Sequence, residues 1–249
     1  GLGIIPHLYA QPLFEGLRNV RKADASAYEI IEDNPAQIAL KLREEELHGA
    51  FLSPVEYAKH PTGCTIIPRL GAVSEGVSQS ILLTFKEGTR QLSRIAVDPT
   101  CASEIVLAHI VLSEKFETIP QFVPFLHPVE RLSANVDGVL AVDREAWAFR
   151  DHVHKLDLVD EWFDLTEMPY VHGFWTFRED TMNAAETNEF VRQSRPGSES
   201  LAAYKADAEY LEPFRYDLDE SAVESLSEFF RMAFYHGLLK EIPDIKFSP

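Results

Sequence analysis

The chain is poor in cysteine, in basic side chains and in long apolar stretches. Its two cysteines, Cys64 and Cys101, lack the spacing of a zinc site or a disulfide framework, which is typical of a reducing compartment. Only 23 Lys and Arg residues stand against 40 Asp and Glu, so the net charge is −17. Because nucleic-acid binding needs clustered basic side chains, we expect no nucleic-acid partner. No apolar run reaches about eighteen residues, which predicts no membrane span.

Motifs for cofactors and activated nucleophiles are also missing. There is no Gly-x-x-x-x-Gly-Lys-Ser/Thr phosphate loop and no Gly-x-Ser-x-Gly elbow. His152 and His154 could share a metal ion on a strand, but a third ligand is not evident, and an exposed turn is the alternative. We therefore expect no cofactor and no metal. No signal peptide is visible, which predicts a cytoplasmic protein, or a periplasmic or extracellular one if an export signal was removed.

What the sequence does contain is enough apolar material for a large core, with 45% hydrophobic residues among 249. Short apolar stretches alternate with helical patterns in the first part of the chain, which predicts a parallel-rich α/β unit. The predicted strands are 1–7, 27–31, 49–53 and 64–70, and the predicted helices are 11–17 and 35–46.

A second α/β unit follows, and the chain ends in helices. Residues 103–116 are apolar on nearly every face, which predicts a buried helix. We expect a two-lobed clamshell with a ligand cleft between the lobes. Lobe 1 would comprise 1–82 and 176–249, and lobe 2 would comprise 83–175. The other predicted strands are 79–85, 94–97, 122–125, 138–142 and 170–177, and the other helices are 144–149, 184–192, 201–210 and 221–236.

Two stretches have the form of a strand end, a polar turn and a helix start. Residues 5–13 read Ile-Pro-His-Leu-Tyr-Ala-Gln-Pro-Leu, and residues 53–58 read Ser-Pro-Val-Glu-Tyr-Ala. They resemble the turns Ser-Tyr-Leu-Asn-Ala-x-Pro-Leu and Ser-Ser-Val-Glu-Tyr-Ala of the chorismate dehydratase-like family of menaquinone biosynthesis, in the futalosine pathway. Two departures stand out: Tyr9 replaces the Asn of the first turn, and Pro6 replaces its Ser. A Tyr offers one hydroxyl and more bulk where the family offers an amide.

Further stretches keep the family's order, so that the resemblance covers roughly residues 3–180. The family segments are Ser-Ser-x-Gly, Ala-Leu-Asp-Thr-Ser-Ser-x-Thr-Ser, Asp-Ala-x-Leu-x-Ile-Gly-Asp, and Leu-Thr-x-x-Pro-Phe-Val with a following Trp. The resemblance implies a type 2 periplasmic-binding-protein-like fold. The matching stretches are 73–76, 96–103, 137–143 and 165–171 with Trp175.

The resemblance implies a carbon–oxygen lyase that eliminates water from chorismate, a small anionic carboxylate, to yield an enolpyruvyl benzoate. A non-catalytic solute-binding protein for a small carboxylate or aromatic ligand is the alternative, which the loss of the Asn at Tyr9 favours. An enzyme of altered substrate within the same family is a third reading. The sequence carries no signal for oligomeric state.

Tyr9 and Ser74 are the residues we expect in catalytic roles. Tyr9 occupies the position of the family's turn Asn, and Ser74 lies in a Gly-containing turn beside the first crossing segment. Glu56 could act as a general base, although a carboxylate in the first turn of a helix is also favoured by the helix dipole alone.

The candidate substrate-binding residues lie where predicted strands end and helices begin, and each also has a purely structural reading. Thr100, Cys101 and Ser103, with the free amides at the start of a helix, could hold a carboxylate or simply cap that helix. Ser53 and Asp143 likewise bind ligand or cap the next helix. Trp175 and Trp147 would stack on a ligand or pack in the core, and His109 is expected to be a core histidine.

Overall fold

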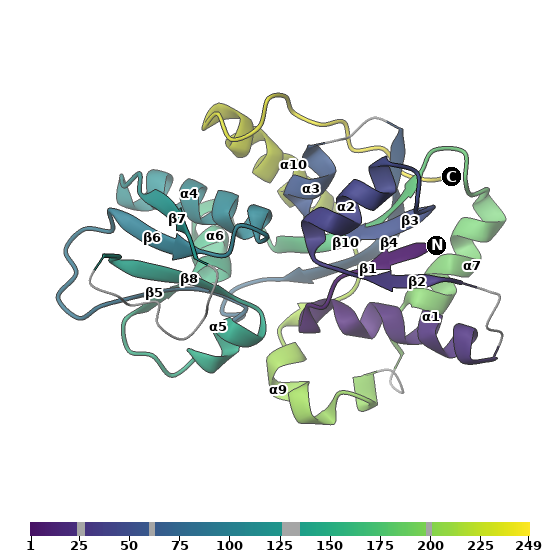
Figure 1. Cartoon of the computed structure of the whole chain (residues 1–249), viewed down its shortest axis with the longest axis horizontal. Helices are drawn as coiled ribbons and strands as arrows, with labels where there is room; N and C mark the ends of the chain where they lie inside the picture. Colours follow the sequence, from purple (N-terminus) through teal and green to yellow (C-terminus); the bar gives the residue numbers. More distant parts are fainter. Residues whose placement is uncertain (24–27, 60–62, 126–134, 198–200) are drawn as a thin grey trace.

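A computed structural model describes the whole chain except residues 24–27, 60–62, 126–134 and 198–200. Figure 1 shows two lobes side by side, each built on one β-sheet with helices against it. We call the part with the six-stranded sheet lobe 1 and the part with the five-stranded sheet lobe 2. Both chain ends lie in lobe 1 (Figure 1). Among the described residues, no helix is long and apolar enough to cross a bilayer.

The lobe 1 sheet is mixed, with the strand order β11-β4-β10-β3-β1-β2. β1 pairs in parallel with β2 and β3, which confirms the predicted parallel arrangement at the start of the chain. β10 then pairs antiparallel with both β3 and β4. The strands are β1 (Leu2–Ile4), β2 (Ile30–Glu32), β3 (Gly49–Leu52), β4 (Cys64–Ser74), β10 (Tyr170–Arg178) and β11 (Phe214–Arg215).

Side-chain caps define where several lobe 1 helices begin. Asn34 accepts a hydrogen bond from the Gln37 amide and precedes Pro35, and Asn183 forms a capping box with Glu186. Residues 201–210 are not the continuous helix predicted. The helices are η1 (Leu8–Ala10), α1 (Gln11–Ala23), α2 (Pro35–Arg43), α3 (Pro54–Ala58), α7 (Ala184–Ser194), η2 (Lys205–Asp207), α9 (Ala208–Leu211) and α10 (Glu220–Tyr235).

Lobe 2 has the strand order β7-β6-β8-β5-β9 and also mixes parallel and antiparallel pairs. Its central helix α4 buries residues on most of its faces, as its apolar sequence predicts. The elements are β5 (Ile81–Phe85), β6 (Arg94–Val97), α4 (Ala102–Phe116), β7 (Gln121–Pro124), β8 (Gly138–Val142), α5 (Arg144–Ala148), β9 (Lys155–Asp157) and α6 (Leu158–Thr166).

The chain passes between the two sheets twice. It leaves the first sheet after Ser74 and enters the second at Ile81, then returns through α6 to β10 at Tyr170. The lobe boundaries predicted at 82/83 and 175/176 therefore fall inside β5 and β10, and all of β10 lies in the lobe 1 sheet.

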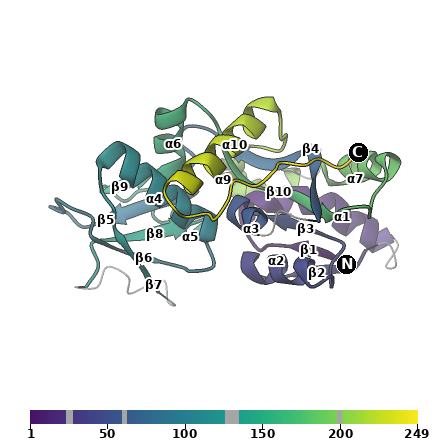
Figure 2. The same ribbon diagram turned by 90° about the horizontal axis from the view of Figure 1, so that it is seen from above.

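The lobes are packed against each other, and one buried hydrophobic cluster extends through both. Helix α4 of lobe 2 contacts α3 and α10 of lobe 1, and α6 contacts β10. Figure 2 shows α10 above this junction, beside α4 and α6. The junction is also where the parallel strands β1 and β3 end, the edge at which open α/β sheets bind ligands.

Candidate functional site

Tyr9 lies at the junction of the lobes, in the short helix that follows β1. Its side chain is buried, and its hydroxyl is 2.9 Å from Nδ1 of His7. The ring stacks on Phe214 with 5.7 Å between centroids and lies 4.9 Å from the ring of His172. Burial raises the pKa of the Tyr9 phenol well above its usual value, and the nearby carboxyls of Glu104 and Asp143 raise it further.

Ser74 is the last residue of β4, and it is buried against His172 of the neighbouring strand β10. Its Oγ lies 2.7 Å from Nε2 of His172. Burial lowers the pKa of His172 to about 3, so this imidazole is neutral at physiological pH. Ser74 is also the register partner of Tyr170. The strand pairing thus brings Ser74, Tyr170 and His172 to one place beside Tyr9.

Ser103 links the two lobes directly. It is the second residue of helix α4 in lobe 2, and its Oγ accepts a hydrogen bond from the Val55 amide of α3 in lobe 1 at 2.9 Å. Ser53 has the backbone conformation of the α3 N-cap, but its side chain makes no capping bond. The expected cap of α3 is therefore supplied by Ser103 across the junction, which leaves the Ser53 hydroxyl without a capping role.

Asp143 makes the second link between the lobes. The carboxylate accepts hydrogen bonds from the Leu8 amide at 2.9 and 3.1 Å and from the Tyr210 hydroxyl at 2.8 Å. It does not cap α5, so the capping interpretation is wrong. Its backbone lies in the left-handed region, at φ 57°, which is unusual for a residue with a side chain. That geometry re-aims the carboxylate from its own helix toward lobe 1.

Thr100 and Cys101 precede α4 but do not cap it. The backbone amide and the hydroxyl of Thr100 both donate to Oδ1 of Asp98, at 2.9 and 2.8 Å, so the hydroxyl closes a local turn. Cys101 occupies the N-cap position without a side-chain capping bond. Burial raises the pKa of its thiol well above the usual value, and Glu104 raises it further, which keeps the thiol neutral.

Glu104 is a residue that the sequence analysis missed. It lies in the first turn of α4 and is only 2% exposed. Burial raises the pKa of its carboxyl; His7 opposes this shift, whereas Asp143 and Glu56 add to it. The signal available in the sequence was a glutamate in the first turn of an otherwise apolar helix. We call the following set the interlobe cluster: His7, Tyr9, Ser74, Ser103, Glu104, Asp143, Tyr170 and His172.

Trp175 does not belong to this cluster. It is fully buried in lobe 1, where its ring meets Phe14, Phe51 and Phe190 edge-on at 5.5, 6.0 and 5.1 Å between centroids. Its predicted ligand-stacking role is therefore replaced by core packing. Trp147 meets Tyr210 edge-on at 5.5 Å between centroids.

The remaining polar candidates have structural partners. The Glu56 carboxylate lies 2.6 Å from Nζ of Lys59, the C-cap residue of the same short helix. Nδ1 of His152 is 3.0 Å from the His154 carbonyl oxygen, in the turn that the sequence predicted as the alternative to a metal site. Within the described part of the chain, no group of three or more His, Cys, Asp or Glu side chains could hold a metal ion.

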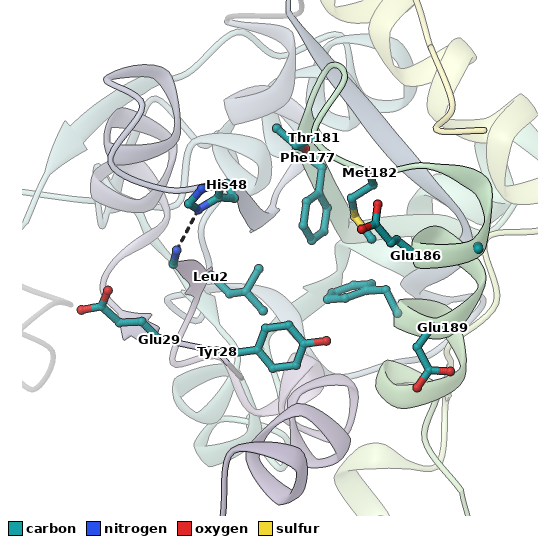
Figure 3. A pocket seen from close by; sticks show the side chains of 12 residues that line it. Leu2, Tyr28, Glu29, His48, Phe177, Thr181, Met182, Glu186 and Glu189 are labelled. Atoms are coloured by element: carbon teal, nitrogen blue, oxygen red, sulfur yellow. Dashed lines mark hydrogen bonds between the residues drawn. The ribbon is translucent and has the colours of Figure 1, made fainter. Parts of the chain in front are cut away.

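A cavity of about 730 Å³ opens elsewhere in lobe 1, where β1 begins (Figure 3). In Figure 3, Leu2, Tyr28 and Phe177 extend into it, while Glu29 and Glu189 lie at its rim. This end of the parallel strands is opposite to the one that carries the polar turns 5–13 and 53–58. The cavity therefore lacks the strand-end geometry of an α/β ligand site, and we place the candidate site at the interlobe cluster.

Comparisons with known proteins identify a family. A family model described as menaquinone biosynthesis matches residues 1–235. Chorismate dehydratase of Thermus thermophilus is 24% identical over 250 aligned positions, covering 88% of this chain and 89% of that protein.

Solved structures resemble the whole chain. An Archaeoglobus fulgidus protein has a TM-score of 0.72 at 19% identity, covering 96% of this chain and 97% of its own. The Escherichia coli periplasmic aliphatic sulphonate-binding protein SsuA has a TM-score of 0.64 at 15% identity, covering 98% and 94%. The alkanesulfonate-binding protein of Xanthomonas axonopodis pv. citri bound to MOPS has a TM-score of 0.65 at 13% identity, covering 97% and 94%. These likenesses show a periplasmic-binding-protein-like fold.

Proposed function

Since this chain belongs to the menaquinone biosynthesis family, we propose that it is a lyase that eliminates water from chorismate or a closely related cyclohexadiene carboxylate. One observation carries the proposal. The buried interlobe cluster joins polar groups from both lobes at the carboxyl ends of β1 and β3. A site that closes in this way excludes water and positions a small ligand, which are the main requirements for an elimination driven by aromatisation.

The elimination needs one proton removed and one delivered. A ring C–H bond breaks, its electron pair completes the aromatic ring, and the neighbouring C–O bond breaks so that hydroxide leaves. In our proposal the Tyr9 hydroxyl donates a hydrogen bond to the leaving oxygen, and His7, which is hydrogen-bonded to Tyr9, accepts the ring proton. The leaving hydroxide then takes up one proton and departs as water, so that the proton removed from the ring balances the one delivered. Ser74, oriented by neutral His172, is proposed to hold a ligand oxygen.

The other candidates take binding roles in this proposal. Ser53 has a hydroxyl free of capping duty, and Ser103 and Asp143 already bridge the lobes that close on the ligand. Thr100 and Cys101 stand at the start of α4, whose first amides have no side-chain cap and favour an anionic group.

A second function is a solute-binding protein without catalysis. The Asp143 carboxylate already accepts hydrogen bonds from the Leu8 amide and the Tyr210 hydroxyl, and Tyr9 is packed between Phe214 and His172. This packing favours a site that closes on a ligand and opens again unchanged.

Incubation with chorismate, followed by ultraviolet absorbance and product identification, tests the proposal. Wild-type protein is expected to turn chorismate over, and Tyr9→Phe is expected to lower kcat by about a hundredfold, because the hydroxyl is lost while the ring remains. Tyr235→Phe is the matched control, since Tyr235 is 71% exposed on α10. Tyr9→Asn shows whether the family's usual amide supports more turnover than Tyr9 does.

The binding function makes the opposite prediction. Absence of turnover, together with saturable thermal stabilisation by another small carboxylate, would remove the lyase proposal and support the solute-binding function.

A further inference from the structure

His172 stands at an irregular point of the lobe 1 sheet. β10 pairs with β4 through Val171 and Val73 and then through Gly173 and Ala72, so the register shifts and His172 is left between two paired residues. A β-bulge of this kind adds one residue to one strand and re-aims its side chain. The bulge therefore decides where the imidazole of His172 points.

Two glycines allow the strands to approach closely beside the bulge. A Cβ atom on Gly173 would lie 2.5 Å from Cε1 of Phe51 and 2.9 Å from the Leu52 carbonyl oxygen. A Cβ atom on Gly71 would lie 2.9 Å from the Gly173 carbonyl oxygen. Side chains at either position would push β10 away from β3 or β4, so the geometry around His172 depends on glycine.

The imidazole aimed in this way contacts Ser74. Its Nε2 is 2.7 Å from Oγ of Ser74, the last residue of β4. Three rings lie against the imidazole, with 4.9, 4.9 and 5.0 Å between centroids: Tyr9, Tyr170 and Phe214. His172 and Ser74 are 0% and 1% exposed, and both belong to the lobe 1 sheet. Their contact therefore does not depend on closure of the lobes.

The other ring nitrogen of His172 shows which atom carries the hydrogen. Among the described residues, Nδ1 is buried and has no hydrogen-bond partner. The imidazole is neutral, since burial lowers its pKa to about 3, and a neutral imidazole carries one hydrogen on either nitrogen. A buried N–H group without an acceptor is rarer in folded proteins than an acceptor without a donor. The hydrogen therefore belongs on Nε2, which donates it to Oγ of Ser74.

This direction of the bond leaves the Ser74 hydroxyl hydrogen unused. A serine hydroxyl has one hydrogen to donate and two lone pairs that accept. Within the described part of the chain, the contact with His172 is the hydrogen bond found for Ser74 Oγ, and in it Oγ accepts. An acceptor for the Ser74 hydrogen must then come from a bound molecule, and a fixed neutral donor of this kind suits an anionic oxygen in a buried site.

We propose that His172 is a positioning residue that makes Ser74 a hydrogen-bond donor to a carboxylate oxygen of the ligand. This inference deepens the proposed function and rests on it for the identity of the ligand as a carboxylate. It adds the direction of each hydrogen bond, from Nε2 to Oγ and from Oγ to the ligand. The ligand atom at Ser74 is therefore an acceptor, and an ammonium or amide nitrogen does not replace it.

Nuclear magnetic resonance tests the assigned hydrogen directly. Two-bond proton–nitrogen correlation spectra of protein labelled with nitrogen-15 in its histidines distinguish the two neutral forms, and the signals lost in His172→Gln belong to His172. Near neutral pH the wild type is expected to show a protonated Nε2 and a bare Nδ1. A protonated Nδ1 would overturn the proposal.

Two variants of His172 separate its N–H group from its ring, with benzoate as the probe in isothermal titration calorimetry. His172→Gln carries an amide N–H in place of Nε2–H, so its Kd is expected to stay within about threefold of the wild type. His172→Phe keeps a ring and loses the donor, which should weaken binding about tenfold. His48→Gln, at an exposed histidine, is the control. Equal weakening by Gln and Phe would mean that only ring packing matters and would overturn the positioning role.

A double-mutant cycle tests whether His172 acts through Ser74. Ser74→Ala is expected to weaken benzoate binding about tenfold, and adding His172→Phe should cause no further loss, because the hydroxyl that His172 orients is already gone. Additive losses, or a Kd unchanged by Ser74→Ala, would refute the proposal. Circular dichroism checks that each variant is folded.

The outcome is separable from that of the lyase, which is tested by turnover of chorismate. Benzoate binding with the expected pattern of variants but without turnover keeps this inference and removes the lyase. Turnover by a protein whose His172 is protonated on Nδ1 does the reverse. Absence of benzoate binding by the wild type would also overturn the assignment of a carboxylate to Ser74.

Discussion

At the scale of single residues, burial changes what a side chain can do as much as its chemical identity does. Tyr9 and Tyr170 keep their phenol protons because the charged form of each would lie away from water. Burial also raises the pKa of the Glu104 carboxyl. His172 loses its proton for the same reason. The interlobe cluster therefore holds neutral phenol and imidazole groups beside its carboxyl groups.

The pH dependence of stability reports on His172. An unfolded histidine takes up a proton near its usual pKa of about 6.5, whereas folded His172 does so only near 3. Protons therefore favour the unfolded chain between these values, and the free energy of unfolding falls as pH drops below about 6.5, by at most about 1.4 kcal/mol per unit. His172→Gln should make this acid limb shallower in urea titrations. His48→Gln, at an exposed histidine, is the control, and equal slopes in wild type and His172→Gln would contradict the assignment.

At the scale of elements, the helix starts of this protein are often stabilised by residues from other segments. Ser103 caps α3 across the junction, and Asp143 holds the amide of Leu8 at the start of η1. Asp157 stabilises its own helix and a neighbouring segment at once. Its carboxylate accepts hydrogen bonds from the Val159 and Asp160 amides of α6 and from the Ser78 and Gln79 amides of the crossing segment. Caps of this kind fix both a helix and its neighbour.

Removal of Asp157 tests that arrangement. Asp157→Ala leaves several amides without their acceptor, among them that of Gln79, which is held at φ 56°. Loss of an N-cap alone costs about 1–2 kcal/mol, and the second set of bonds adds to it. Asp151→Ala, whose side chain is 90% exposed, should stay within about 0.5 kcal/mol of the wild type. Urea unfolding measures both, and equal values for the two variants would show that the shared cap does not stabilise the fold.

At the scale of the whole molecule, two lobes with separate sheets meet through a packed junction, and a few polar bonds bridge it. Under the proposed function, ligand entry requires these contacts to open, as in hinge-bending proteins that close around ligands. The hydrogen bonds of Asp143 to Leu8 and Tyr210 are the polar contacts that would most directly influence the equilibrium between closed and open forms.

Asp143→Ala is expected to shift the protein toward an open form. Small-angle X-ray scattering should show a larger radius of gyration than for wild type, because the bonds to the Leu8 amide and the Tyr210 hydroxyl are lost. A saturating carboxylate ligand should restore compactness in proportion to its binding. Identical scattering curves, with only lower thermal stability, would mean that Asp143 stabilises the fold without controlling closure.

Most of the elements could be predicted, because their signals are local. Asn34 before Pro35 marks the start of α2, and the apolar run in 103–116 marks the buried helix α4. The interruption of the 201–210 region by a turn after its first two helical residues, before η2 and α9, could not be predicted, since the helical pattern contains no break strong enough to show where the chain turns. Of the predicted site residues, Tyr9, Ser74, Ser103 and Asp143 lie at the lobe junction, and their functional roles stay predictions.

The sequence by itself determined the family, the two-lobed α/β class and the turns that end β1 and β3, since strand ends, caps and apolar patterns act between near neighbours in the chain. Only the tertiary structure decided which polar groups share the junction. Glu104 lies beside Tyr9 and Tyr170 because the lobes pack together, and Trp175 faces the core because β10 lies within the lobe 1 sheet. Burial and long-range pairing set these outcomes, and neither can be read from the spacing of residues along the chain.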